Sequence, residues 1–211
     1  MGLSLSVGAL AYCRTRDPEG ADDLRVAFAS ANRLLAANRL PAHREPERLP
    51  RIRDRFPVGD LPYGWFDRLR RAVAYARNEP KKFRPLRRGD AARDRWVIHE
   101  LFTLESHLTC HSDCDGLYIP IDFDGPLYSD DEDDVAGYGL GSSAGGLREL
   151  VQVAPLLGIE LAEGRIDTKQ GMRICREREG DHPFEVERKT WLAFHQAFTQ
   201  SVRYRSAVAF N

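Results

Sequence analysis

The sequence predicts an α+β fold, with residues 1–211 forming a single globular domain in which several amphipathic helices pack on a small β-sheet. Three observations predict it. Apolar residues alternate at the start of the chain, they recur at helical spacing in several later stretches, and an apolar, β-compatible tail ends the sequence. A hydrophobic content of 42% in 211 residues is sufficient for a substantial core.

The two ends of the chain are predicted to be strands. Leu3, Leu5 and Val7 alternate with smaller or polar residues, which is typical of a strand with one buried face. The tail 206–210 reads Ser-Ala-Val-Ala-Phe and is equally compatible with a strand. We therefore expect both termini to lie in one sheet, side by side.

Capping residues and apolar periodicity predict the helices. Asp17 is a plausible N-cap with Pro18 in the first helical position, Ser142 or Ser143 caps a later helix, and Gly158 ends that one. The predicted helices span approximately residues 17–38, 63–77, 143–157, 167–179 and 184–204. In the second of them, the apolar face is expected to leave four arginines largely outside: Arg68, Arg70, Arg71 and Arg77.

The connections between these elements have unusual compositions. Residues 40–62 contain five prolines, and residues 78–95 are basic and also contain proline, so both are predicted to be irregular. Residues 96–104 return to an apolar pattern without a clear preference for helix or strand. The acidic stretch of about residues 124–134 is predicted to be an exposed loop, because its carboxylates repel one another.

Residues 106–123, SHLTCHSDCDGLYIPIDF, concentrate more potential chemistry than any other stretch. Their flanks are apolar or β-branched, and residues 113–116 tolerate turn geometry. The stretch is therefore predicted to form a central β-hairpin with a polar tip.

Four residues of this stretch have the side chains that zinc prefers: His107, Cys110, His111 and Cys114. On a strand, however, the two histidines share one face while Cys110 points to the other, so a tetrahedral site would need irregular backbone. The simpler interpretation makes Cys110 a core residue and places Cys114 in a turn. A metal site remains the alternative prediction.

A hydrolytic site is a related alternative. His111 could act as a general base if Asp113 or Asp115 held it, and a metal-dependent hydrolase could use His107, His111, Asp113 and Cys114. No nucleophile is evident, because Ser142 and Ser143 precede a helical pattern and are better explained as capping residues. We therefore favour a binding protein over an enzyme, with no cofactor.

The charged residues indicate candidate binding surfaces. Lys and Arg number 31 against 32 Asp and Glu, so the total charge favours no nucleic-acid partner. The acidic cluster does not have the spacing of an EF-hand calcium site, but it could mimic nucleic-acid phosphates or mask a basic site on a partner. The acidic cluster consists of Asp122, Asp124, Asp130, Asp131, Glu132, Asp133 and Asp134. The arginines at 51, 53 and 55, and at 84, 87 and 88, suggest the opposite option of an acidic ligand.

No stretch approaches the roughly 20 apolar residues of a membrane span. The N-terminal apolar run lacks a preceding basic region, so it is not predicted to be a signal peptide. The four cysteines are scattered, which favours the reducing cytoplasm.

Three stretches together resemble a group of small, poorly characterised bacterial proteins. They are residues 106–123, GLGSSAGGLRELVQVAPLLGI at 139–159, and ERKTWLAFHQA at 187–197 leading to SAVAF at 206–210. Proteins of this kind resemble the immunity proteins encoded beside polymorphic toxins. The resemblance implies a non-enzymatic inhibitor that binds a cognate toxin, and it carries over no catalytic residue. The expected contact residues are Asp113, Asp115, Asp130, Asp131, Glu132, Asp133 and Asp134.

Overall fold

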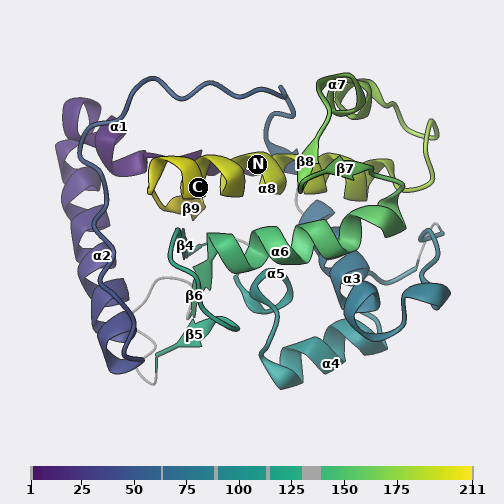
Figure 1. Cartoon of the computed structure of the whole chain (residues 1–211), viewed down its shortest axis with the longest axis horizontal. Coiled ribbons are helices and arrows are strands. Elements are labelled where there is room, and N and C mark those ends of the chain that lie inside the picture. Colours follow the sequence, from purple (N-terminus) through teal and green to yellow (C-terminus); the bar gives the residue numbers. More distant parts are fainter. Residues whose placement is uncertain (1, 63, 88–89, 113–114, 130–138, 211) are drawn as a thin grey trace.

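The computed structural model describes residues 2–62, 64–87, 90–112, 115–129 and 139–210. The fold is α+β, as the sequence predicts (Figure 1). The helices are α1 (Ala9–Arg16), α2 (Pro18–Ala37), α3 (Trp65–Asn78), α4 (Arg95–Thr103), α5 (His107–Cys110), α6 (Ser143–Val153), α7 (Thr168–Arg176) and α8 (Glu185–Tyr204). Short 3₁₀ turns occupy Pro80–Lys82 and Ala154–Leu157.

The main sheet has the strand order β2-β9-β4-β6-β5. Its strands are β2 (Leu5–Val7), β9 (Val208–Phe210), β4 (Leu117–Ile119), β6 (Gly139–Ser142) and β5 (Leu127–Tyr128). Only the β4–β6 pair is parallel among the described pairings of this sheet. Two short antiparallel pairs lie apart from it: β1 (Gly2–Leu3) with β3 (Leu61–Pro62), and β7 (Leu161–Ala162) with β8 (Arg165–Ile166).

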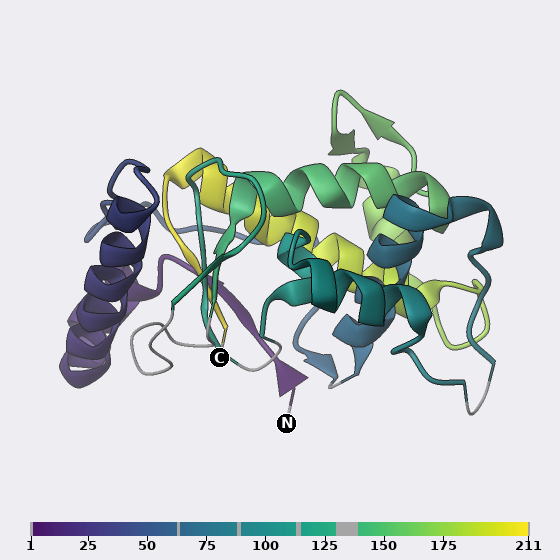
Figure 2. The ribbon, with the colours of Figure 1, turned by 90° about the horizontal axis from the view of Figure 1, so that it is seen from below.

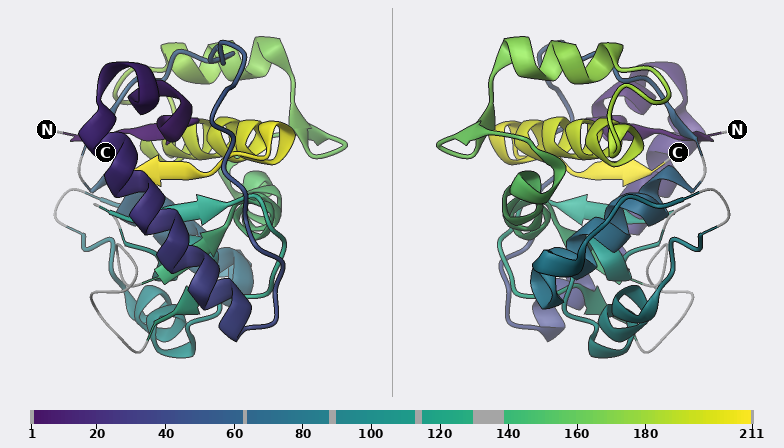
Figure 3. Two further views of the ribbon diagram at one scale, coloured as in Figure 1. Left: turned by 90° about the vertical axis from the view of Figure 1, so that its left-hand side faces the viewer. Right: turned by 90° about the vertical axis from the view of Figure 1, so that its right-hand side faces the viewer.

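Helices cover both faces of the main sheet (Figures 1 and 3). Tyr118, Val208 and Phe210 face a core formed with α3, α6 and α8. The alternate residues of the same strands, such as Ile119 and Ala209, face a second core formed with α1 and α2. Because successive side chains of a strand point to opposite faces, the three-residue strands β4 and β9 take part in both cores.

The N-terminal strand and the C-terminal tail are neighbours, which confirms the prediction for the termini. Leu5 pairs with Phe210 and Val7 with Val208 in antiparallel register. The short helix α1 follows directly after β2 and was not predicted, since its apolar residues do not form a helical stripe. Asp17 then caps α2 by accepting a hydrogen bond from the Gly20 amide at 3.1 Å, as predicted.

The predicted central hairpin is wrong. Residues 107–110 form helix α5, and Ser106 caps it by accepting a hydrogen bond from the Thr109 amide at 3.0 Å. Strand β4 pairs with β6 and β9 rather than with the residues that precede it. The β-branched and apolar composition of this stretch reflects its burial. A buried strand and a buried helical turn have similar compositions, so composition alone did not distinguish them.

Helix α4 occupies the stretch for which no secondary structure was predicted. Helices α3, α6, α7 and α8 lie close to their predicted bounds, but two arginines of α3 are not on the outside. Arg70 is 5% and Arg71 7% exposed. Arg70 donates to the Leu108 carbonyl at 3.3 Å and also to the His111 carbonyl, and Arg71 binds the Asp94 carboxylate at 2.9 Å. These arginines are buried because backbone carbonyls and a carboxylate satisfy their donors.

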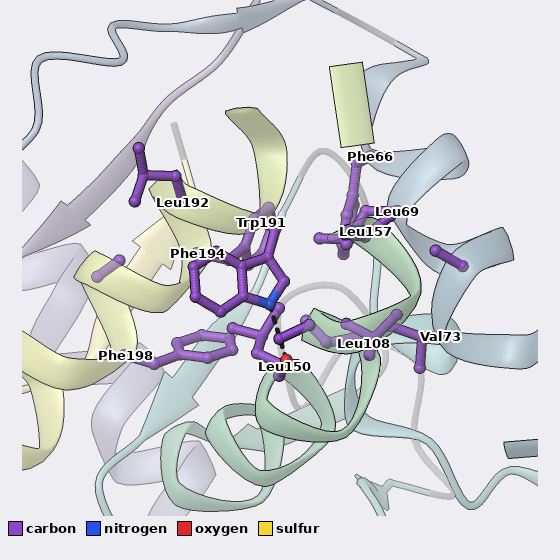
Figure 4. Close-up of a cluster of buried hydrophobic side chains, with 14 of the residues drawn as sticks. Phe66, Leu69, Val73, Leu108, Leu150, Leu157, Trp191, Leu192, Phe194 and Phe198 are labelled. Atoms are coloured by element: carbon purple, nitrogen blue, oxygen red, sulfur yellow. Dashed lines mark hydrogen bonds between the residues drawn. The ribbon is translucent and has the colours of Figure 1, made fainter. Parts of the chain in front are cut away.

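The larger core is centred on Trp191 of α8 (Figure 4). Its indole nitrogen donates to the Leu150 carbonyl of α6 at 2.7 Å, so the polar edge of a fully buried ring is satisfied. Phe194 stacks on Phe66 of α3 with ring centroids 4.5 Å apart. Gly146 lets α6 approach α8, since a β-carbon there would lie 2.4 Å from the ring of Phe198.

Among the described residues, none of the helices combines the length and apolar character needed to cross a bilayer.

Gly146→Ala should destabilise the protein, although alanine is normally the better helix former. The helix-propensity gain of about 1 kcal/mol is smaller than the roughly 1 to 3 kcal/mol that overpacking a core costs. Urea unfolding should therefore show a net loss for Gly146→Ala. The same Gly146→Ala change should cost less stability when it is made in a Phe198→Leu variant, where the double variant is compared with Phe198→Leu alone. A gain in stability from Gly146→Ala would show that α6 and α8 can separate freely.

Candidate functional site

The charges of the chain are strongly segregated along the sequence. Residues 96–147 contain eleven Asp and Glu and no Lys or Arg. We call residues 96–147 the acidic segment. All 31 Lys and Arg lie outside it, together with the other 21 acidic residues. Sequence reasoning detected the acidic cluster inside it but missed its extent. A running count of charge, rather than a search for acidic runs, would have revealed it.

The acidic segment passes through most of α4 and through α5, β4, β5 and β6. In Figure 1, α4 and β5 lie in the lower part of the molecule and α5 lies just below α6, whereas α7 lies at the top. Figure 2 shows α4 and α5 facing the viewer from below. The stretch without cations therefore reaches the surface on a side away from α7.

A buried carboxylate attaches this segment to the rest of the fold. Glu149 of α6 accepts hydrogen bonds from the His107 amide at 2.7 Å, the Leu108 amide at 3.0 Å and the Ser106 hydroxyl at 3.0 Å. It thereby accepts hydrogen bonds from N–H groups that have no partner within α5. The N-terminus of a helix also favours a negative charge. Burial raises the pKa of Glu149 above its ordinary value, against the lowering effect of these hydrogen bonds.

The ring of His107 links two further parts of the chain. Its Nδ1 accepts from the Ser142 amide at 3.3 Å, so Nε2 carries the proton and donates to the Phe123 carbonyl at 3.1 Å. Gly145 makes room for the ring, because a β-carbon would lie 2.2 Å from Nε2. Burial lowers the pKa of His107 to about 4, which keeps the ring neutral.

His111 is equally enclosed. Its ring stacks on Tyr118 with centroids 4.1 Å apart, and its two nitrogens lie 3.1 Å from the carbonyl oxygens of Ser112 and Leu117. Burial lowers the pKa of His111 to about 4, although the two carbonyls act in the opposite direction. A neutral ring donates to only one of them at a time.

The residues predicted for zinc do not assemble into a site in the described part of the chain. Both nitrogens of His107 and of His111 are directed at backbone groups, and the Cys110 thiol donates to the Glu100 carbonyl at 3.2 Å. Burial raises the pKa of Cys110, which disfavours the thiolate that metals bind. Cys114 lies outside the described residues, and no three described His, Cys, Asp or Glu side chains are placed to hold a metal ion.

The hydrolytic arrangement is not formed by the described residues either. Asp115 is exposed and accepts from the Gly116 amide at 2.8 Å, while Asp113 lies outside the described residues. Ser142 is the predicted N-cap, accepting from the Gly145 amide at 2.9 Å. Its hydroxyl donates to the Ile121 carbonyl at 2.7 Å, so it is already engaged in structure.

Several carboxylates of the acidic segment reach the surface. Glu105, Asp115, Asp122 and Asp124 are exposed. Two cations from outside the segment border them: Arg148 pairs with Asp122 and lies 3.9 Å from Asp124, and Arg77 lies 3.1 Å from Glu105. A hollow of about 600 Å³ lies between α6 and the acidic segment, and Glu105, Asp124 and Glu149 are among its lining residues. Solvent-exposed ion pairs of this kind are weak, so the carboxylates can exchange partners.

The most acidic part of the segment joins two described strands at the edge of the main sheet. Tyr128 of β5 pairs with Gly139 of β6, and β5 is the last strand in the sheet order. The expected contact residues between them, Asp130, Asp131, Glu132, Asp133 and Asp134, lie outside the described residues.

Helix α4 exposes apolar residues where the acidic segment begins. Phe102 is 83% exposed, and Ile98, Leu101 and Leu104 are each more than 40% exposed. Glu100, by contrast, is buried, and it pairs with Arg77 at 2.9 Å. Sequence reasoning missed this apolar stripe, because the charged Glu100 is buried while the apolar Ile98, Leu101 and Phe102 are exposed. Contiguous exposed apolar residues of this size often mark a binding surface.

Glu149→Gln should lower the free energy of unfolding by about 1 to 3 kcal/mol, because an amide offers one acceptor oxygen where two backbone N–H groups need partners. Urea unfolding of this variant measures the loss. Glu163→Gln, a change of the same chemistry at an exposed site, is the control and should leave stability nearly unchanged. Equal stability of both variants would mean that Glu149 does not hold α5.

Acid should destabilise the protein through two of its buried histidines, His107 and His111. Their folded pKa of about 4 lies below the ordinary 6.5, so the unfolded chain binds more protons between these values and stability falls as pH falls. Each histidine contributes a loss of about 2 kcal/mol between pH 7 and pH 5. Urea unfolding at both pH values should show a smaller acid-induced loss in His111→Gln than in the native chain. An identical loss would contradict a neutral His111.

One family model matches the chain, over residues 1–210, and its description is "Putative DNA-mimic protein". Neither the comparison with curated proteins nor that with solved structures finds a match. The match extends over nearly all of the sequence, including the whole acidic segment and the helices that carry it. The chain therefore belongs to this DNA-mimic family.

Proposed function

We propose that the chain binds a DNA-binding protein and that the acidic segment occupies the surface with which this partner contacts DNA. The observation that carries the proposal is the segregation of charge: eleven carboxylates and no cation in residues 96–147. DNA-binding proteins present clusters of Lys and Arg to phosphates, and carboxylates are their natural competitors. Membership of the DNA-mimic family supports the same conclusion.

A run of consecutive carboxylates can match the charge spacing of DNA. Residues 130–134 are five consecutive acidic residues. A fully extended chain advances about 3.3 to 3.6 Å per residue, and one strand of duplex DNA carries one phosphate per about 3.4 Å of axis. A run of carboxylates can therefore offer a partner charges at a density similar to that of a single DNA strand.

The exposed stripe of α4 adds a contact that DNA does not provide. Glu105 follows this stripe directly and its side chain is 69% exposed, so apolar and acidic groups adjoin. Charge attraction weakens with salt, whereas apolar burial does not. The binding free energy of the complex would therefore contain an apolar contribution that resists salt, in addition to the electrostatic contribution.

A cognate bacterial toxin that acts on nucleic acid is a specific partner of this class, and it accords with the resemblance to immunity proteins. Such a toxin would need a cationic surface for its substrate, and the expected contact residues Asp113, Asp115 and Asp130 to Asp134 would bind it. Neutralisation would then occur by occupation of that surface, in the cytoplasm, without any catalytic step.

The test begins with the immobilised full chain and a nuclease-treated extract of its own cells. Proteins eluted by duplex DNA are identified, and one of them is purified. Its binding to a labelled duplex is then titrated with the full chain. We expect the chain and the duplex to exclude each other and the complex to weaken as salt rises.

Matched variants separate a specific surface from total charge. Converting the run 130–134 to amides should weaken the complex about tenfold or more, through loss of five charge contacts. The control also removes five negative charges, by amide substitutions at exposed residues elsewhere: Glu19, Asp22, Asp23, Glu160 and Glu163. It should stay within about twofold of the native chain. A complex insensitive to both duplex DNA and the run variant would refute the proposal.

A further inference from the structure

A hollow of about 580 Å³ lies between residues 53–56, strand β8 and the C-terminal half of α8. Four arginines line it: Arg53, Arg55, Arg165 and Arg203. Its described lining contains no carboxylate. The neighbouring hollow between β7–β8 and α7 differs in this respect, because Glu160, Glu163 and Glu177 are among its lining residues.

The hollow is held in shape by side-chain amides of α8. Gln196 accepts from the Phe56 amide at 2.8 Å and donates to the Phe56 carbonyl at 3.3 Å. One turn later, Gln200 donates to the Arg53 carbonyl at 3.4 Å and to Asp54 at 3.3 Å. The proline-containing segment that carries Arg53 and Arg55 is thus attached to α8 at two places, which limits the conformational entropy lost when a ligand binds.

Neutral groups contact two of the four guanidinium groups, those of Arg55 and Arg203. Arg55 donates to the Ile166 carbonyl at 3.4 Å and to the Thr168 hydroxyl, and it lies 5.1 Å from the centroid of the Phe56 ring. Arg203 lies 5.4 Å from the centroid of the Tyr204 ring. Within the described part of the chain, none of the four arginines forms a salt bridge. Four like charges in one hollow repel one another, and an anionic ligand would relieve that repulsion.

From this geometry we propose that the hollow binds a ligand carrying two or more linked phosphate groups. A guanidinium presents a planar pair of donors that matches phosphate oxygens, and four of them from three parts of the chain can serve more than one phosphate. The volume is that of a small-molecule site. Inorganic polyphosphate and a nucleoside polyphosphate share this chemistry, and Tyr204 lines the hollow where a base could stack.

This site is independent of the acidic segment. Nucleic acid is the less suitable ligand, because the acidic segment of the same molecule repels a long polyanion and the four arginines surround one hollow rather than a stripe. A small ligand meets only the local potential, since charges further away than about 8 Å are largely screened at physiological salt.

Calorimetric titration of the full chain at low salt tests the proposal, with orthophosphate, tripolyphosphate, ATP and a short DNA duplex as separate probes. We expect one site for tripolyphosphate or ATP, and at least tenfold weaker binding of orthophosphate. Equal affinities for tripolyphosphate and ATP would assign recognition to the phosphates alone, and tighter binding of ATP would add the nucleoside. Failure of both probes to bind at millimolar concentration, or tighter binding of the duplex, would overturn the proposal.

The double variant Arg55→Gln, Arg203→Gln should reduce tripolyphosphate affinity at least tenfold. The control, Arg44→Gln with Arg48→Gln, removes the same charge from exposed positions that do not line the hollow, both in the proline-containing segment 40–62 that also carries Arg55. It should retain binding within about twofold of the native chain. Equal losses in both variants would show that the ligand responds only to total charge, against the proposal. Thermal unfolding of each variant verifies that it remains folded.

Discussion

The contact between Glu149 and the first turn of α5 is the constraint on which the arrangement of the acidic segment depends. Two backbone N–H groups and one hydroxyl converge on a single carboxylate contributed by α6. Without it, the start of α5 would leave buried donors unsatisfied, at a cost comparable with that of a lost hydrogen bond for each. Because α6 also packs against Trp191, this contact connects the acidic segment to the largest core.

His107 extends the same constraint in a second direction. Its ring joins the start of α6, through the Ser142 amide, to the Phe123 carbonyl in the chain that leads from β4 to β5. One buried, neutral imidazole therefore binds both the end of β6 and the connection between β4 and β5. Asp122 and Asp124, on either side of Phe123, are exposed as a consequence of where that residue is held.

Local signals predicted most of the fold, and their failures have a common cause. The N-caps Asp17, Ser142 and Asp167 each accept a hydrogen bond from an amide two or three residues further along the chain. Such local caps can be identified from the sequence. Helix α5 is stabilised by Glu149, some forty residues away, and no local pattern reports such a partner. Arg70 likewise is buried because its guanidinium serves carbonyls of Leu108 and His111, which the periodicity of α3 cannot show.

The near-neutral total charge conceals two surfaces of opposite character. Residues 96–147 hold eleven acidic groups without a cation, and the hollow on α8 gathers four arginines without a lining carboxylate. Interactions between exposed charges extend only about 8 Å at physiological salt, so each ligand responds to its own surface and not to the sum. For this reason total charge could not identify the partners of the chain. What identifies a partner is where the fold places the negative and the positive charges. The contacts of Glu149 position the acidic segment, and those of Gln196 position the segment that carries two of the four arginines.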